Sequence, residues 1–313
     1  MSWWRAILVL AALALAACGT AHQLPERDRA APPAKLAGGS PAHVAVIVME
    51  NEEYGDLLAA PHIPYIHHLV ASGALAGQMY AITHPSLPNY LALTTGSTHG
   101  ISDDCTGCSV PGSGLAGQLS AHRISWQAYM EDMPRPCFTG ADAGLYAKKH
   151  NPFIYADALR ADAAACARIV PLGHLGADER AGTLPRFIWV TPNLCHDMHD
   201  CDPSSGDQFL AATVPALLAA MGPRSLLIVT WDEGSSNDGC CRLAHGGHIL
   251  TVLAGPAARH GVRLGTAADH YSTLQLIEDL FGLPRAGGAS CPCTPSLTPL
   301  LGRASARDAR HRS

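Results

Sequence analysis

The chain has 313 residues, of which 48% are hydrophobic and 15% are charged. This composition excludes extended disorder for most of the chain and allows the buried core of one large domain. The formal net charge of -5 at pH 7 also argues against a general nucleic-acid-binding protein, which needs a basic surface.

An apolar run from Ala6 to Ala17, preceded by Arg5, predicts an export signal over residues 1–17. The run is too short to span a bilayer, but it fits the apolar core of a secretory signal. It ends in LAAC at residues 15–18, which resembles a bacterial lipobox and predicts lipidation of Cys18. Ordinary signal cleavage nearby is the alternative. We therefore expect export from a bacterial cell, as a periplasmic or envelope-anchored lipoprotein or as a secreted protein.

The rest of the chain divides by composition. Residues 18–42 are rich in Ala, Pro and Gly and predict a flexible tether, and residues 303–313 predict a frayed basic tail. Residues 43–302 are expected to form a single domain. Within this domain, residues 102–150 have frequent Cys, Pro and Gly and little periodicity, which predicts an insertion or a lid.

The cysteines indicate disulfides. Ten of the eleven cysteines follow Cys18, and an even number in an exported protein indicates up to five disulfide bonds. The pairs in CTGC at 105–108 and CPC at 291–293 suggest zinc as an alternative, but the sequence lacks a second ligand pair at finger-like spacing. Disulfides are the favoured interpretation, and the sequence leaves their pairing open.

Short apolar runs alternate with helical patterns between residues 43 and 302. Such runs are typical of strands buried on both faces, and their alternation with helices predicts an α/β fold, a three-layer sandwich with a central, mostly parallel sheet. The predicted strands are Val44–Met49, Arg186–Val190, Leu226–Thr230 and Ile249–Ala254, and the predicted helices are Ile63–Ser72, Leu87–Thr95, Ala156–Arg168, Gln208–Ala220 and Tyr271–Phe281.

Polar residues stand next to each predicted strand. Ligands of open α/β sheets bind beyond the carboxyl ends of the strands. Three strands carry carboxylate, amide and imidazole groups to that edge, which predicts one polar site. These residues are Glu50 and Asn51 after the first strand, Asn193, His196, Asp197 and His199 after the second, and Asp232 and Glu233 after the third, with His245 and His248 before the fourth.

Ser86 is the candidate nucleophile. It stands in HPSLPNY at residues 84–90, where Pro88 suits the first turn of a helix and so places Ser86 at or just before the helix N-terminus. The helix dipole and the free N–H groups there favour an alkoxide and an attached phosphate. By position alone, however, Ser86 is better explained as a helix cap.

Six motifs follow one another along the chain: MENEEY (49–54), HPSLPNYLALTTGSTHGI (84–101), TPNLCHDMHDCD (191–202), WDEG (231–234), HGGH (245–248) and DHYSTLQLIEDLFGL (269–283). As an ordered set they resemble the bacterial phosphoesterase family of secreted acid phosphatases and phospholipases C, within the alkaline-phosphatase superfamily. The chain looks most like the short exported acid phosphatases, including those that act on phosphatidylinositol 3-phosphate. The resemblance implies an alkaline-phosphatase-like catalytic domain over residues 43–302.

The resemblance also implies roles for individual residues. Ser86 would accept the phosphoryl group, and Asn89 would contact a phosphate oxygen. The positions that hold a metal beside the nucleophile are matched by Glu50, Asn51, Ser86, Asp232 and Glu233. The positions that bind phosphate, assist the leaving group or hold a second metal are matched by His84, Asp197, His199 and His248, of which His199 and His248 are the expected catalytic histidines.

Several other residues match the family less well. The weaker matches are Tyr54, Asn193, His245 and His270. His196 matches no known role and is expected at the surface. The histidines expected to be structural or at the surface are His62, His67, His68, His122 and His174.

The chain departs from the two-zinc members of the superfamily in its metal ligands. Those members usually have Asp at the position of Glu50 and Asp-His at the position of Asp232-Glu233. Carboxylate and amide oxygens suit Mg²⁺, Ca²⁺ or Mn²⁺ better than zinc, so we expect one divalent ion rather than a two-zinc site. Tyr90 stands where the sulfatases have Arg, which excludes a sulfatase.

The expected activity is that of an exported, metal-assisted phosphomonoesterase with a phosphoserine intermediate. His199 would protonate the leaving group, and an acidic optimum is expected because imidazolium is populated below about pH 6.5. The expected substrate is a phosphate monoester, including phosphoinositides, with membrane contact through Cys18 and no nucleic-acid partner. The alternatives are a phosphodiesterase or phospholipase C on the same fold and, against the presence of Ser86, Glu50 and Asp232, a non-catalytic envelope lipoprotein.

Overall fold

The structure of the protein is a computed structural model that describes residues 40–241 and 243–302. The predicted export signal, Cys18 and the basic tail lie outside the described residues, as does nearly all of the tether. No helix within the described ranges has the length and apolar character needed to cross a membrane.

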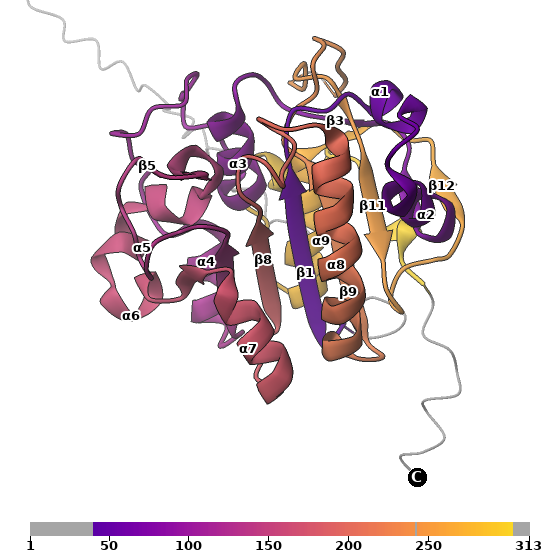
Figure 1. The fold of residues 1–313 in the computed structure, drawn as a ribbon. Helices are drawn as coiled ribbons and strands as arrows, with labels where there is room; N and C mark the ends of the chain where they lie inside the picture. Colours follow the sequence, from indigo (N-terminus) through magenta and orange to yellow (C-terminus); the bar gives the residue numbers. More distant parts are fainter. Residues whose placement is uncertain (1–39, 242, 303–313) are drawn as a thin grey trace, which may run out of the picture. The chain divides into compact units, whose positions relative to one another are not determined.

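An eight-stranded sheet forms the middle layer (Figure 1), in the order β12-β2-β11-β9-β1-β8-β4-β7. β1 pairs in parallel with β8 and β9, and burial of its residues from Val44 onward explains its uninterrupted apolar sequence. The bounds are β1 (His43–Met49), β2 (Ala74–Ala76), β4 (Trp126–Met130), β7 (Ile169–Pro171), β8 (Phe187–Thr191), β9 (Ser225–Trp231), β11 (Thr251–Ala254) and β12 (Val262–Leu264).

Two small sheets lie outside the central one. The three-stranded sheet has the order β10-β3-β13, and β5 pairs with β6. The bounds of their strands are β3 (Met79–Tyr80), β5 (Asp142–Ala143), β6 (Tyr146–Ala147), β10 (His248–Ile249) and β13 (Ala268–Asp269).

Helices cover both faces of the central sheet. α8 packs with α2 and α7 on one face, and α9 packs with α3, which contacts α4, on the other (Figure 1). The predicted three-layer α/β fold is thus confirmed. The bounds are α1 (Tyr54–Ala59), α2 (Pro64–Ser72), α3 (Ser86–Thr95), α4 (Gly114–Ala121), α5 (Asp157–Ala161), α6 (Ala163–Cys166), α7 (Gly173–Ala181), α8 (Pro203–Met221) and α9 (His270–Phe281), with 3₁₀ turns at Lys148–His150, Pro152–Tyr155, Gly287–Ser290 and Thr298–Leu300.

Two predicted elements differ in the structure. The predicted parallel strand Ile249–Ala254 begins at Thr251 as β11 and runs antiparallel to β9. A parallel partner would need a crossover helix, and the described residues between β9 and β11 form none. The predicted helix Ala156–Arg168 is divided into α5 and α6 at Asp162, whose side chain caps α6.

The prediction that residues 102–150 form an insertion is wrong for the middle of that region. β4 lies between β8 and β7 in the central sheet, and α4 packs against it. Gln127 interrupts the apolar pattern of this strand, and the strand is therefore not recognised from the sequence. The irregular parts are the segments before α4 and after β4, and each contains a disulfide-bonded cysteine.

The structure pairs ten cysteines in five disulfides, as the even count predicts. All five join residues that are close in the sequence or in neighbouring elements. The pairs are Cys105–Cys108, Cys137–Cys166, Cys195–Cys201, Cys240–Cys241 and Cys291–Cys293.

The start of α2 is capped by a residue of another helix. Ile63 at its N-cap makes no side-chain hydrogen bond, and buried Asp207 of α8 instead accepts from the N–H groups of Tyr65 at 3.3 Å and Ile66 at 2.7 Å. We expect Asp207→Ala to lower the free energy of unfolding by about 2–3 kcal/mol, measured in urea, because buried donors lose a charged acceptor. Asp162→Ala removes an exposed cap and should lower it by about 1 kcal/mol at most. Equal losses would contradict the buried cap.

Glu278 of α9 is a buried carboxyl group whose Oε1 accepts from Ala286 N at 2.9 Å, while its Oε2 has no hydrogen-bond partner in the described part of the chain. Burial raises its pKa to about 8. A raised pKa means that stability is fully present below the unfolded pKa near 4.5 and is lost as the pH rises through about 8. We expect Glu278→Gln to raise the melting temperature by about 5 °C at pH 8 and hardly at all at pH 5, measured by calorimetry. A gain that does not depend on pH would contradict this account.

Candidate active site

The polar residues that follow the strands gather at one edge of the central sheet. The carboxyl ends of β1, β8 and β9 lie together there, at the upper end in Figure 1. Because β11 is antiparallel to β9, its amino end and the preceding HGGH segment reach the same edge. Gly247 permits this approach, since its φ is 95° and a Cβ would lie 2.7 Å from Gly234.

Ser86 is the first residue of α3 and is buried. Its Oγ donates to Glu50 Oε2 at 3.1 Å and lies 3.4 Å from Glu233 Oε1. The N-cap position belongs to Pro85, so Ser86 does not act as the cap that its position in the sequence favours. Its hydroxyl instead faces two carboxylates, the groups that would accept its proton if it acted as a nucleophile.

Asn89 fixes the segment that leads into Ser86. Its Oδ1 accepts from the backbone N–H groups of Ile82 at 3.0 Å and Thr83 at 3.1 Å, and its Nδ2 donates to Thr83 O at 2.7 Å. The side-chain amide is therefore engaged by the backbone, and the predicted contact with a phosphate oxygen remains a prediction.

Glu50 lies at the centre of the site, fully buried directly after β1. Its Oε1 accepts from the Tyr90 hydroxyl at 2.5 Å and lies 3.3 Å from His150 Nε2, while Oε2 accepts from Ser86. Asn51, the next residue, has a φ of 58°, which asparagine tolerates. This backbone turn points the Asn51 N–H toward the next carboxylate of the site.

Asp232 and Glu233 follow β9. Asp232 Oδ1 accepts from the N–H groups of Glu233 at 2.6 Å and Asn51 at 3.2 Å, whereas its buried Oδ2 has no partner among the described residues. Glu233 Oε2 accepts from His84 Nδ1 at 2.5 Å, and the other ring nitrogen of His84 faces a backbone oxygen. His270 Nε2 donates to the Asp232 carbonyl at 2.5 Å, and burial lowers the pKa of His270 to about 4, so this ring is neutral.

A second group of side chains completes the site. His150 is buried, with Nδ1 3.0 Å from Asp197 Oδ2, and Asp197 Oδ1 accepts from the His199 N–H at 2.8 Å. His199 Nδ1 donates to Asp200 Oδ1 at 2.6 Å, and its Nε2 lies 3.0 Å from Lys149 Nζ. Asp197 and His199 were expected here, whereas His150 and Lys149 are additions from the region predicted as an insertion.

Burial and neighbouring negative charges disfavour the ionised forms of the carboxyl groups in the site. Burial, followed by the charges of Asp232 and Asp197, raises the pKa of Glu50, and burial with the charge of Glu233 raises that of Asp232. Burial also raises the pKa values of Asp197 and Glu233 to about 7. A bound cation would reverse these shifts because it favours the ionised forms.

The donor set therefore fits a metal ion. Asp232 Oδ2 is a buried oxygen without a hydrogen-bond partner among the described residues, and burial together with the neighbouring carboxyl group of Glu233 raises the pKa of Asp232. A second possible set consists of Glu50, His150 and His199, whose ligand atoms lie within 4.8 Å of one another. Glu50 belongs to this set and also lies among the oxygen donors around Ser86 and Asp232. It would therefore be a ligand at either position of the ion.

His248, one of the two expected catalytic histidines, stacks against tyrosines at this edge, and its catalytic role stays a prediction. Its ring stacks between Tyr54, at 4.3 Å, and Tyr80, at 4.9 Å, and its buried Nε2 has no hydrogen-bond partner among the described residues. The pairing of β10 with β3 brings His248 opposite Tyr80. His245 is exposed. The structure therefore does not bring the ring of His248 into hydrogen-bond contact with Ser86.

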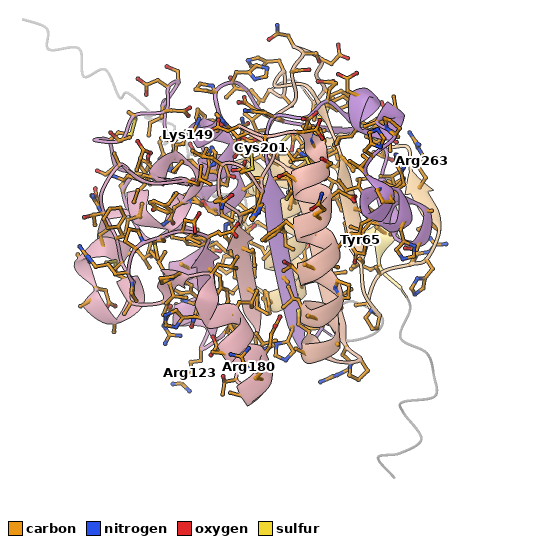
Figure 2. The ribbon with its side chains drawn as sticks, in the orientation of Figure 1. Tyr65, Arg123, Lys149, Arg180, Cys201 and Arg263 are labelled. Carbon is orange, nitrogen blue, oxygen red and sulfur yellow. A yellow bond between two sulfur atoms is a disulfide. The ribbon has the colours of Figure 1, made fainter. Side chains whose placement is uncertain are left out.

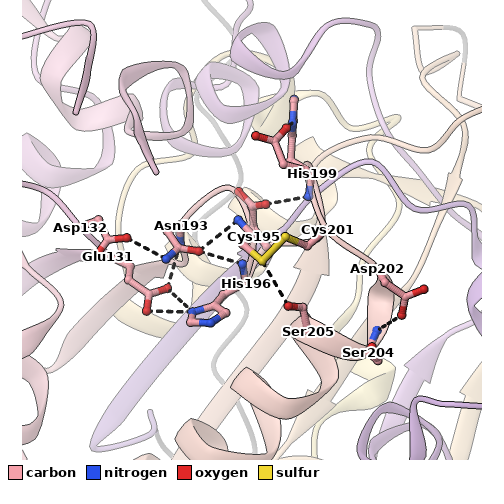
Figure 3. The surroundings of a disulfide bond; sticks show 12 residues. Glu131, Asp132, Asn193, Cys195, His196, His199, Cys201, Asp202, Ser204 and Ser205 are labelled. Carbon is pink, nitrogen blue, oxygen red and sulfur yellow. Dashed lines mark hydrogen bonds and ion pairs between the residues drawn. A yellow bond between two sulfur atoms is a disulfide. The ribbon is translucent and has the colours of Figure 1, made fainter. Parts of the chain in front are cut away.

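Asn193 and His196 stabilise the loop after β8 (Figure 3). Asn193 Oδ1 accepts from the N–H groups of Cys195 and His196, and its Nδ2 donates to Asp132. His196 pairs with Glu131 at 2.9 Å, with 41% of its side chain exposed, as expected of a surface residue. The five histidines expected to be structural or at the surface are exposed, apart from half-buried His67.

A mostly parallel α/β sheet covered by helices on both faces also occurs in a solved structure from the alkaline phosphatase superfamily. A member of that superfamily from Vibrio parahaemolyticus has the same fold, with a TM-score of 0.55 at 14% identity over 83% of this chain and 72% of that one. The phosphonate monoester hydrolase of Silicibacter pomeroyi gives a TM-score of 0.52 at 11% identity over 85% and 78%.

Comparison of the amino-acid sequence identifies the family to which the chain belongs. The Phosphoesterase family model matches residues 56–284, and the chain belongs to this family. It is 34% identical to a phosphatidylinositol-3-phosphatase of Mycobacterium tuberculosis over 83% of each chain. It is 29% identical to an acid phosphatase of Aspergillus fumigatus over 78% of this chain and 55% of that one. The chain is accordingly a phosphoric ester hydrolase.

Proposed function

We propose that the protein is an exported, metal-assisted phosphomonoesterase of the acid phosphatase type, with Ser86 as the phosphoryl acceptor. The contact of Ser86 Oγ with Glu50 and Glu233 carries this proposal, because a serine becomes a nucleophile only where a base or a metal activates it. The relatives named as phosphatases support the monoester class, including phosphoinositides as substrates. The five disulfides support export.

One divalent ion would be held by oxygen ligands beside Ser86. The ligands proposed are Glu50, Asn51, Ser86, Asp232 and Glu233. Hard oxygen donors favour Mg²⁺, Ca²⁺ or Mn²⁺ over a two-zinc site. When bound, the ion would supply Lewis acidity and counter-charge for the phosphoryl oxygens.

The residues of the chain perform the proton and bond transfers. Ser86 Oγ attacks phosphorus and gives its proton to Glu50 or Glu233, while the bond from phosphorus to the ester oxygen breaks. His199, held by Asp200 at Nδ1, gives a proton from Nε2 to the leaving oxygen once Lys149 Nζ, which faces Nε2 in the substrate-free structure, has turned toward the phosphoryl group. Water then attacks the phosphoserine and gives a proton to His199, the bond from phosphorus to Oγ breaks, and Ser86 regains the proton held by Glu50 or Glu233 as phosphate leaves.

The neighbouring side chains position these groups. His84 donates to Glu233 and holds it toward Ser86, and Asn89 holds the turn before α3. Asp197 binds both His150 and the His199 N–H, which fixes the direction of the proposed acid. We propose that His84 and Asn89 contact the phosphate once the substrate has displaced the groups to which they are hydrogen-bonded in this structure.

The test compares turnover of p-nitrophenyl phosphate and bis-p-nitrophenyl phosphate between pH 4 and pH 9, with each of Mg²⁺, Ca²⁺, Mn²⁺ and Zn²⁺ after EDTA dialysis. We expect metal-dependent monoester turnover with an acidic optimum. Preferential diester turnover would replace the proposal with a phosphodiesterase or phospholipase C. Full activity after dialysis would contradict the role of a metal, and phosphatidylinositol 3-phosphate is the next substrate to assay.

A further inference from the structure

Lys149 places a positive charge at the edge of the proposed active site. Its side chain is 20% exposed, so a ligand can reach it, and Figure 2 shows it near the upper end of the sheet. Its Nζ lies 3.1 Å from Asp104 Oδ2 and 3.0 Å from His199 Nε2. A cation is thus held beside the proposed acid by two side chains.

Asp104 links Lys149 to the nucleophile. Its Oδ1 accepts from the Leu87 N–H at 3.0 Å, and Leu87 directly follows Ser86. This N–H is one of the donors that the first turn of α3 leaves without an intrahelical partner. A carboxylate of the protein therefore lies between a helix N–H and a lysine, the two kinds of donor that bind phosphate.

The segment that carries Asp104 is held firmly in place. Asp104 directly precedes the disulfide between Cys105 and Cys108, and Lys148 Nζ donates to Thr106 O. The segments before α4 and after β4 are thus tied together at this point. The disulfide and the hydrogen bond of Lys148 therefore hold Lys149 near the start of α3.

We propose that Lys149 is the residue that selects phosphate monoesters over diesters, and that Asp104 is its positioning residue. This inference rests on the proposed function. At neutral pH a monoester carries a second negative charge that a diester lacks, and a cation beside the phosphoryl oxygens stabilises that extra charge. Asp104 holds Lys149 in place. In the free enzyme its carboxylate accepts from the Leu87 N–H, and the phosphoryl group of the substrate takes over this hydrogen bond.

The experiment measures kcat/KM for p-nitrophenyl phosphate and bis-p-nitrophenyl phosphate in Lys149→Ala and in the wild type. We expect monoester kcat/KM to fall by about 50-fold and diester kcat/KM by less than about threefold. Arg180→Gln removes an exposed positive charge from α7, at the opposite end of the sheet (Figure 2), and should change neither value. Equal losses for both substrates, or no loss, would overturn the inference.

Asp104→Asn tests positioning, because asparagine still accepts from Leu87 but no longer attracts Lys149. We expect monoester kcat/KM to fall by about fivefold, with no further loss when this change is added to Lys149→Ala. Losses that multiply in the double variant would mean that Asp104 acts independently of Lys149, and would contradict its assignment as the positioning residue.

A binding measurement separates this inference from the proposed function. Inorganic phosphate should raise the melting temperature of the wild type and of Arg180→Gln, and Lys149→Ala should need about tenfold more phosphate for the same rise. If the wild type turns over neither substrate, the proposed function fails, and the phosphate response alone decides whether Lys149 binds the anion. An unchanged response in Lys149→Ala would refute that role.

Discussion

Ser86→Ala is expected to lower monoester kcat by at least about a thousandfold while leaving the fold intact. The Ser86 hydroxyl faces Glu50 and Glu233 rather than a helix N–H, so its removal leaves no capping group unpaired. Steady-state assays with saturating metal measure the loss. Acid-quenched wild-type reactions should also contain phosphate on Ser86, detected by mass spectrometry.

Ser290→Ala is the matched control for this change. Ser290 is exposed, and its hydroxyl donates to the Gly287 carbonyl at 2.7 Å, so its loss should leave kcat unchanged. Wild-type turnover by Ser86→Ala with a normal melting temperature would rule out the covalent mechanism. A lower melting temperature with unchanged kcat would mean that Ser86 is a structural residue.

The sequence predicts best where a strand is buried on both faces. β1 and β9 are recognisable because burial on both faces makes most of their positions apolar, and each ends in residues that the sheet topology carries to one edge, Glu50 and Asp232 among them. β4 escapes detection because Gln127 breaks its apolar pattern. Its position between β8 and β7 is determined by packing across the sheet rather than by local sequence.

His150 and Lys149 could not be assigned to the site from sequence alone. They belong to a 3₁₀ turn that reaches the site because it packs against α3, a contact between distant parts of the chain. A signal does exist, since the polar KKHN at 148–151 directly precedes the apolar PFIY at 152–155. His248 is a residue whose predicted catalytic role stays a prediction. Its motif suggests catalysis, but the pairing of β10 with β3 places its ring between two tyrosines.

Glu50→Gln is expected to abolish most activity and yet stabilise the metal-free protein. Burial and the charges of Asp232 and Asp197 raise the pKa of Glu50. A carboxyl group with a raised pKa stabilises least at high pH, because its contribution is lost as the pH rises through the folded value. Without metal, the melting temperature of Glu50→Gln should therefore exceed that of the wild type at pH 8 and match it near pH 5.

Added metal should reverse this order. Mn²⁺ or Mg²⁺ stabilises the wild type by binding ionised carboxylates, and more strongly at pH 8 than at pH 5, because protons compete for the same oxygens. Glu50→Gln should lose most of this metal-induced rise and at least about a hundredfold of monoester kcat/KM. Thermal melts with EDTA and with metal at both pH values, together with assays, make the measurement.

Glu278→Gln is the control that distinguishes an effect of the metal site from the effect of neutralising any buried carboxyl group. Glu278 is also a buried carboxyl group, and its pKa is raised to about 8. The substitution should raise the melting temperature at pH 8 without changing kcat/KM or the response to metal. If Glu50→Gln behaves in the same way, Glu50 is not a ligand. If instead Glu50→Gln destabilises the metal-free protein equally at pH 5 and pH 8, its hydrogen bonds with Tyr90 and Ser86 outweigh the repulsion between carboxylates, and the electrostatic case for a bound cation fails with it.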